Sequence, residues 1–408
     1  MRRHLHTVAF GALPTAAAMA AAMGVGRFVY TPILPLMTTQ AGLTAQVAGH
    51  LATANYVGYL GGAVATTLSP RLARSAVACR LALAGIVASL AAMALTVNVF
   101  AWLTLRTAAG FASAVVFVVA VDTLLERLPE KAGWGFGGVG AGIAVSAAVV
   151  LALPTESWRT AWWAAAGLAA VLAAAGWWVR PQRLAATAET ARAQVHRAGT
   201  ARFALLFTGY TLEGIGYIIA GTFLVAAVAQ HSPGALGSSV WLVVGLAVIP
   251  SAGLWARLGT RLGRPAMLTA ALALQAAGIA LACQGSSAAS LTGALLFGGT
   301  FIGVSTLAMA EGRLLGTRGA VALLTVGYSV GQIAGPLVVA PLMDGGYQPA
   351  LVVSALIVSL AALATAAVGI LGRQPGVGLV HFQRRGVAGE FVDDRPHGRS
   401  VFAGPPHE

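Results

Sequence analysis

Apolar runs of about twenty residues, separated by short polar loops, recur along the whole chain. A helix that crosses a lipid bilayer needs about 20 mainly apolar residues, so each run predicts one membrane-spanning helix. The pattern therefore predicts an all-α membrane protein with twelve transmembrane helices. The runs cover residues 12–37, 47–68, 76–97, 100–124, 134–153, 160–179, 203–228, 239–257, 265–283, 290–310, 319–342 and 349–371.

A polar stretch with five arginines, residues 180–202, divides these runs six and six. We expect an N-terminal six-helix half at 1–180, a cytoplasmic linker at 181–202 and a C-terminal six-helix half at 203–371. Residues 372–408 form a polar tail rich in Pro and Gly, a composition typical of disordered segments.

The two halves repeat at a nearly constant offset, which predicts a pseudo-symmetric pair. Gly24 and Gly26 match Gly214 and Gly216, and LSPRLAR at 68–74 matches LGTRLGR at 258–264, all 190 positions later. Two such halves with a site between them at the bilayer midplane are the architecture of many secondary transporters. Duplication by itself does not show transport.

Composition and charge agree with a membrane protein and fix its predicted orientation. The chain is 58% hydrophobic and 9% charged, against roughly 25% charged residues in soluble domains. Of its 25 Lys and Arg residues, 22 lie in the termini, the linker and alternate loops. This distribution places both termini in the cytoplasm. It also explains the net charge of +13 without nucleic-acid binding.

Other features exclude several function classes. The N-terminus resembles a signal peptide, but the first apolar run continues to Met37. It therefore predicts a membrane span that stays in the protein and is not cleaved off. Cys79 and Cys283 lie in apolar runs, and no histidine spacing suits a metal, so we expect no disulfide, metal or cofactor. The chain lacks G-x-x-x-x-G-K-[ST], H-E-x-x-H and G-x-S-x-G motifs, so neither a nucleotide-driven pump nor an enzyme is expected.

Arg27 is the strongest candidate for a functional residue. It lies deep in the first run, where a charge costs about 3 kcal/mol even on lenient insertion scales. Glycines before it and Pro32 and Pro35 after it suggest a break in this helix, and broken helices often line transport sites. A guanidinium there could bind a carboxylate or phosphate. The alternative is a structural pair that closes the two halves.

Glu213 is a second buried charge, one turn before Tyr217, which is the repeat match of Arg27. A Glu that alternately faces water and Arg27 could load and release a proton. The alternative is a permanent ion pair between Glu213 and Arg27 that holds the halves together.

Polar side chains on two other runs are further candidates. Asn55 and Tyr59 are four residues apart and share a helix face. They could hydrogen-bond a solute, although helix-to-helix contact beside neighbouring glycines is the simpler interpretation, and Tyr59 is the better candidate of the two. Gln332 and Tyr328, one turn apart on the eleventh run, could also face a central cavity.

Several strings together resemble the major facilitator superfamily, and more narrowly its YbfB/YjiJ-like branch. They are GVGRFVYTPILPLM at 24–37, ANYVGYLGG at 54–62, LEGIGYIIAGTFL at 212–224, GQIAGP at 331–336, GTRLGR at 259–264 and Arg106-Thr-Ala-Ala-Gly110. GTRLGR is similar to the superfamily loop signature, with Thr260 in place of its aspartate. The resemblance covers nearly all twelve runs and implies a transporter without naming its cargo.

The resemblance also implies roles for charged residues. Arg106 would help proton coupling or cavity electrostatics, and the alternative is snorkelling toward the external interface. The loop arginines Arg71, Arg74, Arg261 and Arg264 would form cytoplasmic gate salt bridges. Asp122 with its neighbours, and Glu311 with Arg313, would do the same.

The sequence thus predicts a monomeric secondary transporter in the cytoplasmic membrane, most simply proton-coupled. It would move a small organic solute, and its partners would be that solute and the lipid bilayer. A uniporter, or a non-transporting receptor on the same scaffold, stays open as an alternative. Neither the charge of the solute nor the direction of transport follows from the residues.

Overall fold

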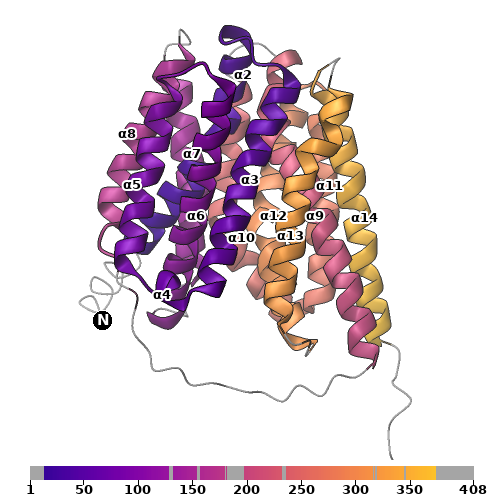
Figure 1. Cartoon of the computed structure of the whole chain (residues 1–408). Coiled ribbons are helices and arrows are strands. Elements are labelled where there is room, and N and C mark those ends of the chain that lie inside the picture. Colours follow the sequence, from indigo (N-terminus) through magenta and orange to yellow (C-terminus); the bar gives the residue numbers. More distant parts are fainter. Residues whose placement is uncertain are drawn as a thin grey trace, which may run out of the picture. The chain divides into compact units, whose positions relative to one another are not determined.

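A computed structural model describes residues 13–127, 132–153, 157–179, 181, 197–231, 236–315, 317, 319–343 and 346–373. All regular elements in these ranges are helices, most of them running roughly parallel (Figure 1). They are η1 (Ala20–Arg27), α2 (Tyr30–Gln40), α3 (Ala45–Leu68), α4 (Pro70–Ala73), α5 (Ala76–Met93), α6 (Val99–Arg127), α7 (Ala132–Ala152), α8 (Trp158–Gly176), α9 (Arg197–His231), α10 (Leu236–Leu262), α11 (Arg264–Ala282), α12 (Ser287–Leu314), α13 (Ala320–Val339), η3 (Ala340–Leu342) and α14 (Gln348–Arg373).

Ten helical segments in the described ranges are long and apolar enough to cross a membrane. The chain is therefore a multi-pass membrane protein. Helices α3 and α8, with 24 and 19 residues, are not among the ten. Polar side chains such as Asn55 and Arg159, and the glycines of α3, lower their hydropathy. The exact number of twelve spans stays a prediction.

Some boundaries differ from those that the sequence predicts. Helix α9 begins at Arg197, within the stretch expected to be linker, so its first six residues, RAGTAR, precede the predicted apolar run at 203–228. Only Gly263, at φ 93°, separates α10 from α11, so the expected loop is a sharp corner that favours glycine. Residues 182–196 and the tail after Arg373 lie outside the described residues.

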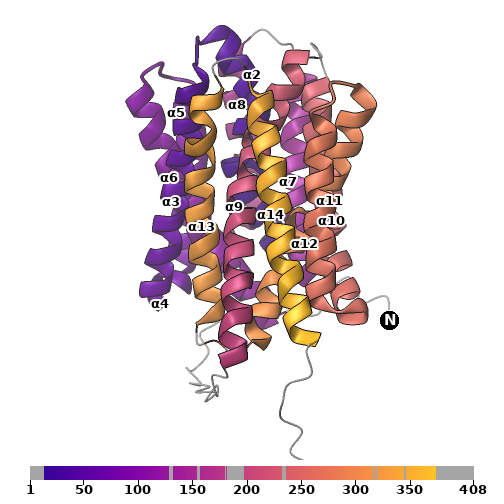
Figure 2. The same cartoon turned by 90° about the vertical axis from the view of Figure 1, so that its right-hand side faces the viewer.

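Most helices before the linker pack mainly on one another, and so do most helices after it (Figure 1). Figure 2 shows α13, α9 and α14 of the second group side by side. In the first group α6 contacts α3 and α5, and α7 contacts η1. In the second group α9 contacts α13 and α14, and α12 contacts α10 and α11. The two groups meet mainly where α7 packs on α10, α3 on α13 and α2 on α9. This pattern agrees with two halves, whose boundaries stay a prediction.

A pair of matched hydrogen bonds supports the predicted repeat. Gln40 Oε1 accepts the backbone N–H of Trp158 at 2.8 Å. At an offset of 189–190 positions, Gln230 Oε1 accepts the backbone N–H of Tyr347 at 2.9 Å. Each glutamine ends one helix and supplies an acceptor to the start of another, where helical N–H groups lack partners.

A second matched pair lies beside the first. Arg159 Nε donates to the carbonyl oxygen of Ala94 at 3.0 Å, and Gln348 Nε2 donates to that of Cys283 at 2.8 Å. The second pair is 189 positions after the first. Different side chains thus make the same contact. The segments that hold them, SWRTA at 157–161 and GYQPA at 346–350, are therefore only weakly similar in sequence although the geometry repeats.

Glycines allow the closest helix contacts. A Cβ atom added at Gly58 of α3 would lie 2.0 Å from the carbonyl oxygen of Thr107, and one at Gly110 of α6 would lie 1.9 Å from that of Asn55. Gly142 of α7 meets the backbone of η1 in the same way. Small residues at helix crossings let backbones approach where no hydrophobic force acts between helices.

Candidate functional site

The first span is broken at Arg27, as its glycines and prolines indicate. Residues Ala20–Arg27 form a π-helical turn, and α2 starts only at Tyr30. Wide turns of this kind leave backbone carbonyls without their usual partners and occur often at functional sites. The break directs the Arg27 side chain into the interior, where it is 3% exposed.

Arg106 of α6 fills the gap in the backbone bonding. Its two terminal nitrogens donate to the carbonyl oxygens of Gly26 at 3.3 Å and of Arg27 at 3.1 Å. Its guanidinium also lies over the ring of Tyr30, 5.0 Å from the centroid. The side chain is 1% exposed, so the snorkelling alternative is wrong. Arg106 points inward and holds the break in shape.

Aromatic rings and one amide surround Arg27. Its guanidinium carbon lies 4.1 Å from the ring centroid of Tyr59, 5.0 Å from Tyr56 and 5.4 Å from Phe28. One terminal nitrogen donates to Gln332 Oε1 on α13. Aromatic faces stabilise a cation by about 2 kcal/mol when water is excluded. Arg27 Nε has no acceptor among the described residues, so one donor is left over.

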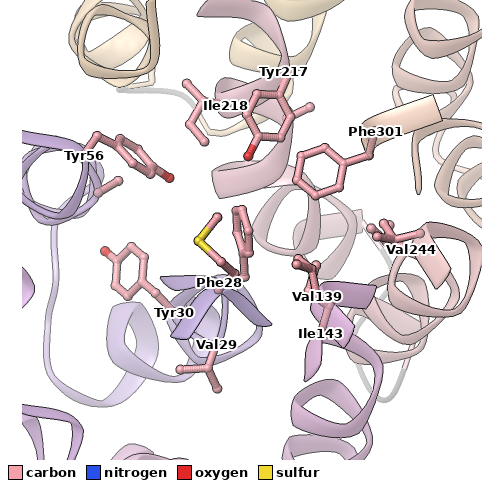
Figure 3. Close-up of a cluster of buried hydrophobic side chains, with 14 of the residues drawn as sticks. Phe28, Val29, Tyr30, Tyr56, Val139, Ile143, Tyr217, Ile218, Val244 and Phe301 are labelled. Atoms are coloured by element: carbon pink, nitrogen blue, oxygen red, sulfur yellow. The ribbon is translucent and has the colours of Figure 1, made fainter. Parts of the chain in front are cut away.

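The neighbours of Arg27 also join helices on either side of the linker. The Tyr56 hydroxyl hydrogen-bonds Thr222 Oγ1 at 3.0 Å, and Thr31 Oγ1 donates to the carbonyl oxygen of Gly221 at 2.6 Å. Figure 3 shows Phe28 with Tyr56 on one side and the rings of Tyr217 and Phe301 on the other. Its ring is 5.7 Å from that of Phe301, edge to face.

Asn55 is a helix-to-helix contact. It is fully buried, and its Nδ2 donates to the carbonyl oxygen of Arg106 at 3.0 Å. This bond joins α3 to α6 at their glycine crossing. Tyr59, one turn later, reaches Arg27 instead, so the two residues on this face serve different purposes.

A stack of aromatic rings leads from Arg27 toward Glu213. Tyr217 lies 4.7 Å from Phe301 and 5.7 Å from Tyr328, and Tyr328 lies 4.5 Å from Tyr210, measured between ring centroids. The rings within each pair are within 28° of parallel. Tyr217 and Tyr328 are close enough to interact electrostatically with both Arg27 and Glu213.

Glu213 is fully buried near the middle of α9. Its Oε1 accepts a hydrogen bond from Gln275 Nε2 of α11 at 3.4 Å. No ion pair joins Glu213 to Arg27, although both residues are described, so the permanent pair is absent from this conformation. Glu213 Oε2 has no donor among the described residues.

The arginines at the predicted cytoplasmic end show one ion pair in the described ranges. Arg202 donates to Glu311 at 3.2 Å, joining α9 to α12, and Arg264 acts on Glu311 electrostatically. Glu311 therefore pairs with Arg202, and the expected pair with Arg313 is wrong. Arg202 was missed because it lies on another helix, 109 positions away in sequence.

The other gate candidates lie at the same end. Arg71, Arg74 and Arg261 are exposed, and Asp122 is half-buried in the last turns of α6. Their gating role stays a prediction.

A family model described as "Uncharacterised MFS-type transporter YbfB" matches residues 19–366 of the chain. The protein belongs to this transporter family. The match covers every helix from η1 to most of α14, and thus the whole site around Arg27 and Glu213. A search of curated proteins found no match.

Solved transporter structures share the fold of this family member. The nucleoside transporter NupG is 13% identical with a TM-score of 0.64, covering 88% of this chain and 99% of its own; a point mutant of NupG gives 14%, 0.63, 87% and 98%. A bacterial homolog of the human lysosomal transporter Spinster, inward-facing and unoccupied, is 12% identical with a TM-score of 0.64, covering 88% and 96%. These identities show a shared fold and nothing about cargo.

Gln275 is a second residue that sequence reasoning missed. It is a buried amide in an apolar helix, and the repeat places Gly85 at the matching position of the first half. Because the search for candidates followed charges and repeated motifs, an unrepeated amide was passed over. A scan for amides near the middle of spans would have found it.

Proposed function

We propose that this family member is a proton-coupled secondary transporter that carries a small organic solute across the cytoplasmic membrane by alternating access. The observation that carries the proposal is the separation of two buried charges. Arg27 lies in an aromatic cage with a spare donor, and Glu213 lies apart from it beside an amide. Intramembrane charges are functional by default.

Arg27 supports a solute that bears a carboxylate or a phosphate. A guanidinium offers five donors in a planar fork, and Arg27 commits one nitrogen to Gln332. Glu213 is 0% exposed and already has a polar partner, so it is a poorer anchor for a cationic solute. The rings of Tyr59 and Tyr217 would pack on the apolar part of the solute.

Alternating access requires contacts between the two groups of helices that can open. The bonds from Arg27 to Gln332, and from Tyr56 to Thr222, are contacts of this kind. Transporters with two repeats rock one against the other around a central site. A solute that displaces Gln332 from Arg27 would link binding to that movement.

The proposed membrane orientation and oligomeric state rest on the sequence alone. We expect both termini in the cytoplasm, since the arginine-rich loops lie on one side, and we expect a monomer. Gate salt bridges at the loop arginines would close the cytoplasmic side in part of the cycle. A uniporter on the same fold would keep the Arg27 site but show no response to a pH gradient.

The test uses purified protein in proteoliposomes that enclose a pH-sensitive dye. A panel of carboxylates, zwitterions, phosphates and nucleosides is added with and without an imposed pH gradient. We expect one class of anionic solute to move protons together with itself. In Arg27→Gln the apparent affinity should fall about 10- to 100-fold, the equivalent of one charge-assisted pair.

Arg159→Gln is the matched control, because it makes the same change at an arginine that donates to a backbone carbonyl at a helix end instead of to Gln332. Uptake that is the same with and without the imposed pH gradient would indicate a uniporter. Binding without any flux would indicate a receptor. A solute bound equally well by Arg27→Gln would refute Arg27 as the anchor.

A further inference from the structure

We infer that Glu213 and Gln275 together form a proton-binding site, in which the neutral acid and the amide hydrogen-bond each other reciprocally. This inference deepens the proposed function, on which it rests, by naming where the coupling proton is held. It rests on two buried side-chain oxygens, one on Glu213 and one on Gln275, that lack a hydrogen-bond donor.

The two side chains already share one hydrogen bond. Gln275 Nε2 donates to Glu213 Oε1 at 3.4 Å, and both side chains are 0% exposed. The other oxygen of each group, Glu213 Oε2 and Gln275 Oε1, has no donor among the described residues. Two buried acceptors on adjacent groups both lack a hydrogen, and a buried polar atom without a hydrogen-bond partner destabilises the protein.

A single proton on Glu213 Oε2 provides the missing hydrogen. An ionised carboxylate can only accept, whereas a protonated one carries an O–H donor. The O–H then donates to Gln275 Oε1, while the amide N–H continues to donate to Glu213 Oε1. The reciprocal pair satisfies both orphan oxygens at once, which no rotation of the amide achieves for an ionised carboxylate.

The surroundings favour a proton over a metal or a counter-charge. The titratable groups that face Glu213 are Tyr210 and Tyr217 on its own helix and Tyr328 on α13. Two side chains hydrogen-bond the Glu213 carboxyl group, namely Gln275 on α11 and the hydroxyl of Tyr328 on α13. Among the described residues no Lys, Arg or His forms an ion pair with Glu213. No described group of three acidic, His or Cys residues could hold a metal.

The pair belongs to one half alone. The repeat matches Glu213 to Met23 and Gln275 to Gly85, so the first half has neither the acid nor the amide. It has Arg27 in place of Tyr217 instead. Proton binding and solute binding are thus assigned to different halves, and the ring of Tyr217 lies between them.

Infrared difference spectroscopy on the full chain in nanodiscs tests this site without any solute. The wild type should show at neutral pH the C=O band of a protonated carboxylic acid, absent from Glu213→Gln. In Gln275→Met, which keeps the length but removes the amide, this band should shift to higher wavenumber. Gln348→Met, an amide change at a helix end, should leave the band in place.

A second measurement covers variants that fail to fold. In wild type labelled with ¹³C-glutamine, raising the pH until the acid band disappears should move the amide band of a single buried glutamine at the same pH. An acid band that is absent at neutral pH, or that stays in place in Gln275→Met, would overturn the inference. An amide band that does not move when the acid band disappears would also overturn the inference.

These outcomes are independent of transport. A proton held by the pair in a protein that shows no pH-driven flux would refute the proposed function and leave the site standing. Proton-coupled flux without a Glu213 acid band would refute the Glu213–Gln275 site and leave the proposed function standing.

Discussion

Replacement of Gly110 by alanine tests how the helix crossing of α3 and α6 supports the site. The added Cβ would lie 1.9 Å from the carbonyl oxygen of Asn55 and 3.0 Å from the backbone nitrogen of Tyr59. Both are backbone atoms, so no side chain can rotate away. The helices must separate by roughly 1.3 Å to reach an ordinary contact of about 3.2 Å, and interiors packed like crystals resist such shifts.

The separation has a calculable penalty. Overpacking of this kind costs about 1–3 kcal/mol. The bond from Asn55 Nδ2 to the carbonyl oxygen of Arg106, 3.0 Å long, stretches and loses about 1 kcal/mol. Alanine regains roughly 1 kcal/mol in helix propensity. The net expectation is a destabilisation of about 1–3 kcal/mol.

Gly85→Ala and Gly167→Ala are the matched controls, because a Cβ at either position meets no atom within 4 Å. Both should be neutral or slightly more stable. The assay is unfolding in mixed detergent micelles followed by circular dichroism, with uptake measured in parallel. Uptake by Gly110→Ala should fall, since Tyr59 moves away from Arg27. Stability of Gly110→Ala equal to that of the controls would refute the packing argument.

Three further changes have expected outcomes. Arg106→Gln should destabilise the fold by about 2–4 kcal/mol in the same unfolding assay, because two buried carbonyls lose charged donors; Arg106→Lys should recover only part of this, and full recovery would contradict the two-carbonyl role. Gln40→Ala and Gln230→Ala should each cost about 1 kcal/mol and act additively; strong coupling between them would contradict two separate matched contacts. Tyr59→Leu should weaken solute binding measured by thermal shift more than it weakens the fold, and an unchanged affinity would exclude this ring from the site.

Much of the fold could be predicted from the sequence because each membrane span needs a continuous run of apolar residues, which can be recognised locally. Runs of apolar residues, arginine-rich loops and the break near Arg27 are all local signals. The matched bonds of Gln40 and Gln230 support the predicted repeat of the two halves.

The contacts of individual side chains could not be predicted in the same way. Arg106 was expected to serve coupling or to snorkel, and it caps carbonyls on a helix 79–80 positions earlier. Glu213 was expected to face Arg27, and it lies beside Gln275. Buried polar side chains pair with groups on other helices that are close in space but distant in sequence. No periodic pattern along the chain indicates which groups these are.

The most direct test of the account is proton movement driven by solute. Proteoliposomes of the wild type, loaded with a pH-sensitive dye, should acidify or alkalinise only when a transported anionic solute is added. Glu213→Gln should exchange the labelled solute across the membrane and yet move no protons. Solute-driven proton movement of equal size in Glu213→Gln would contradict the account.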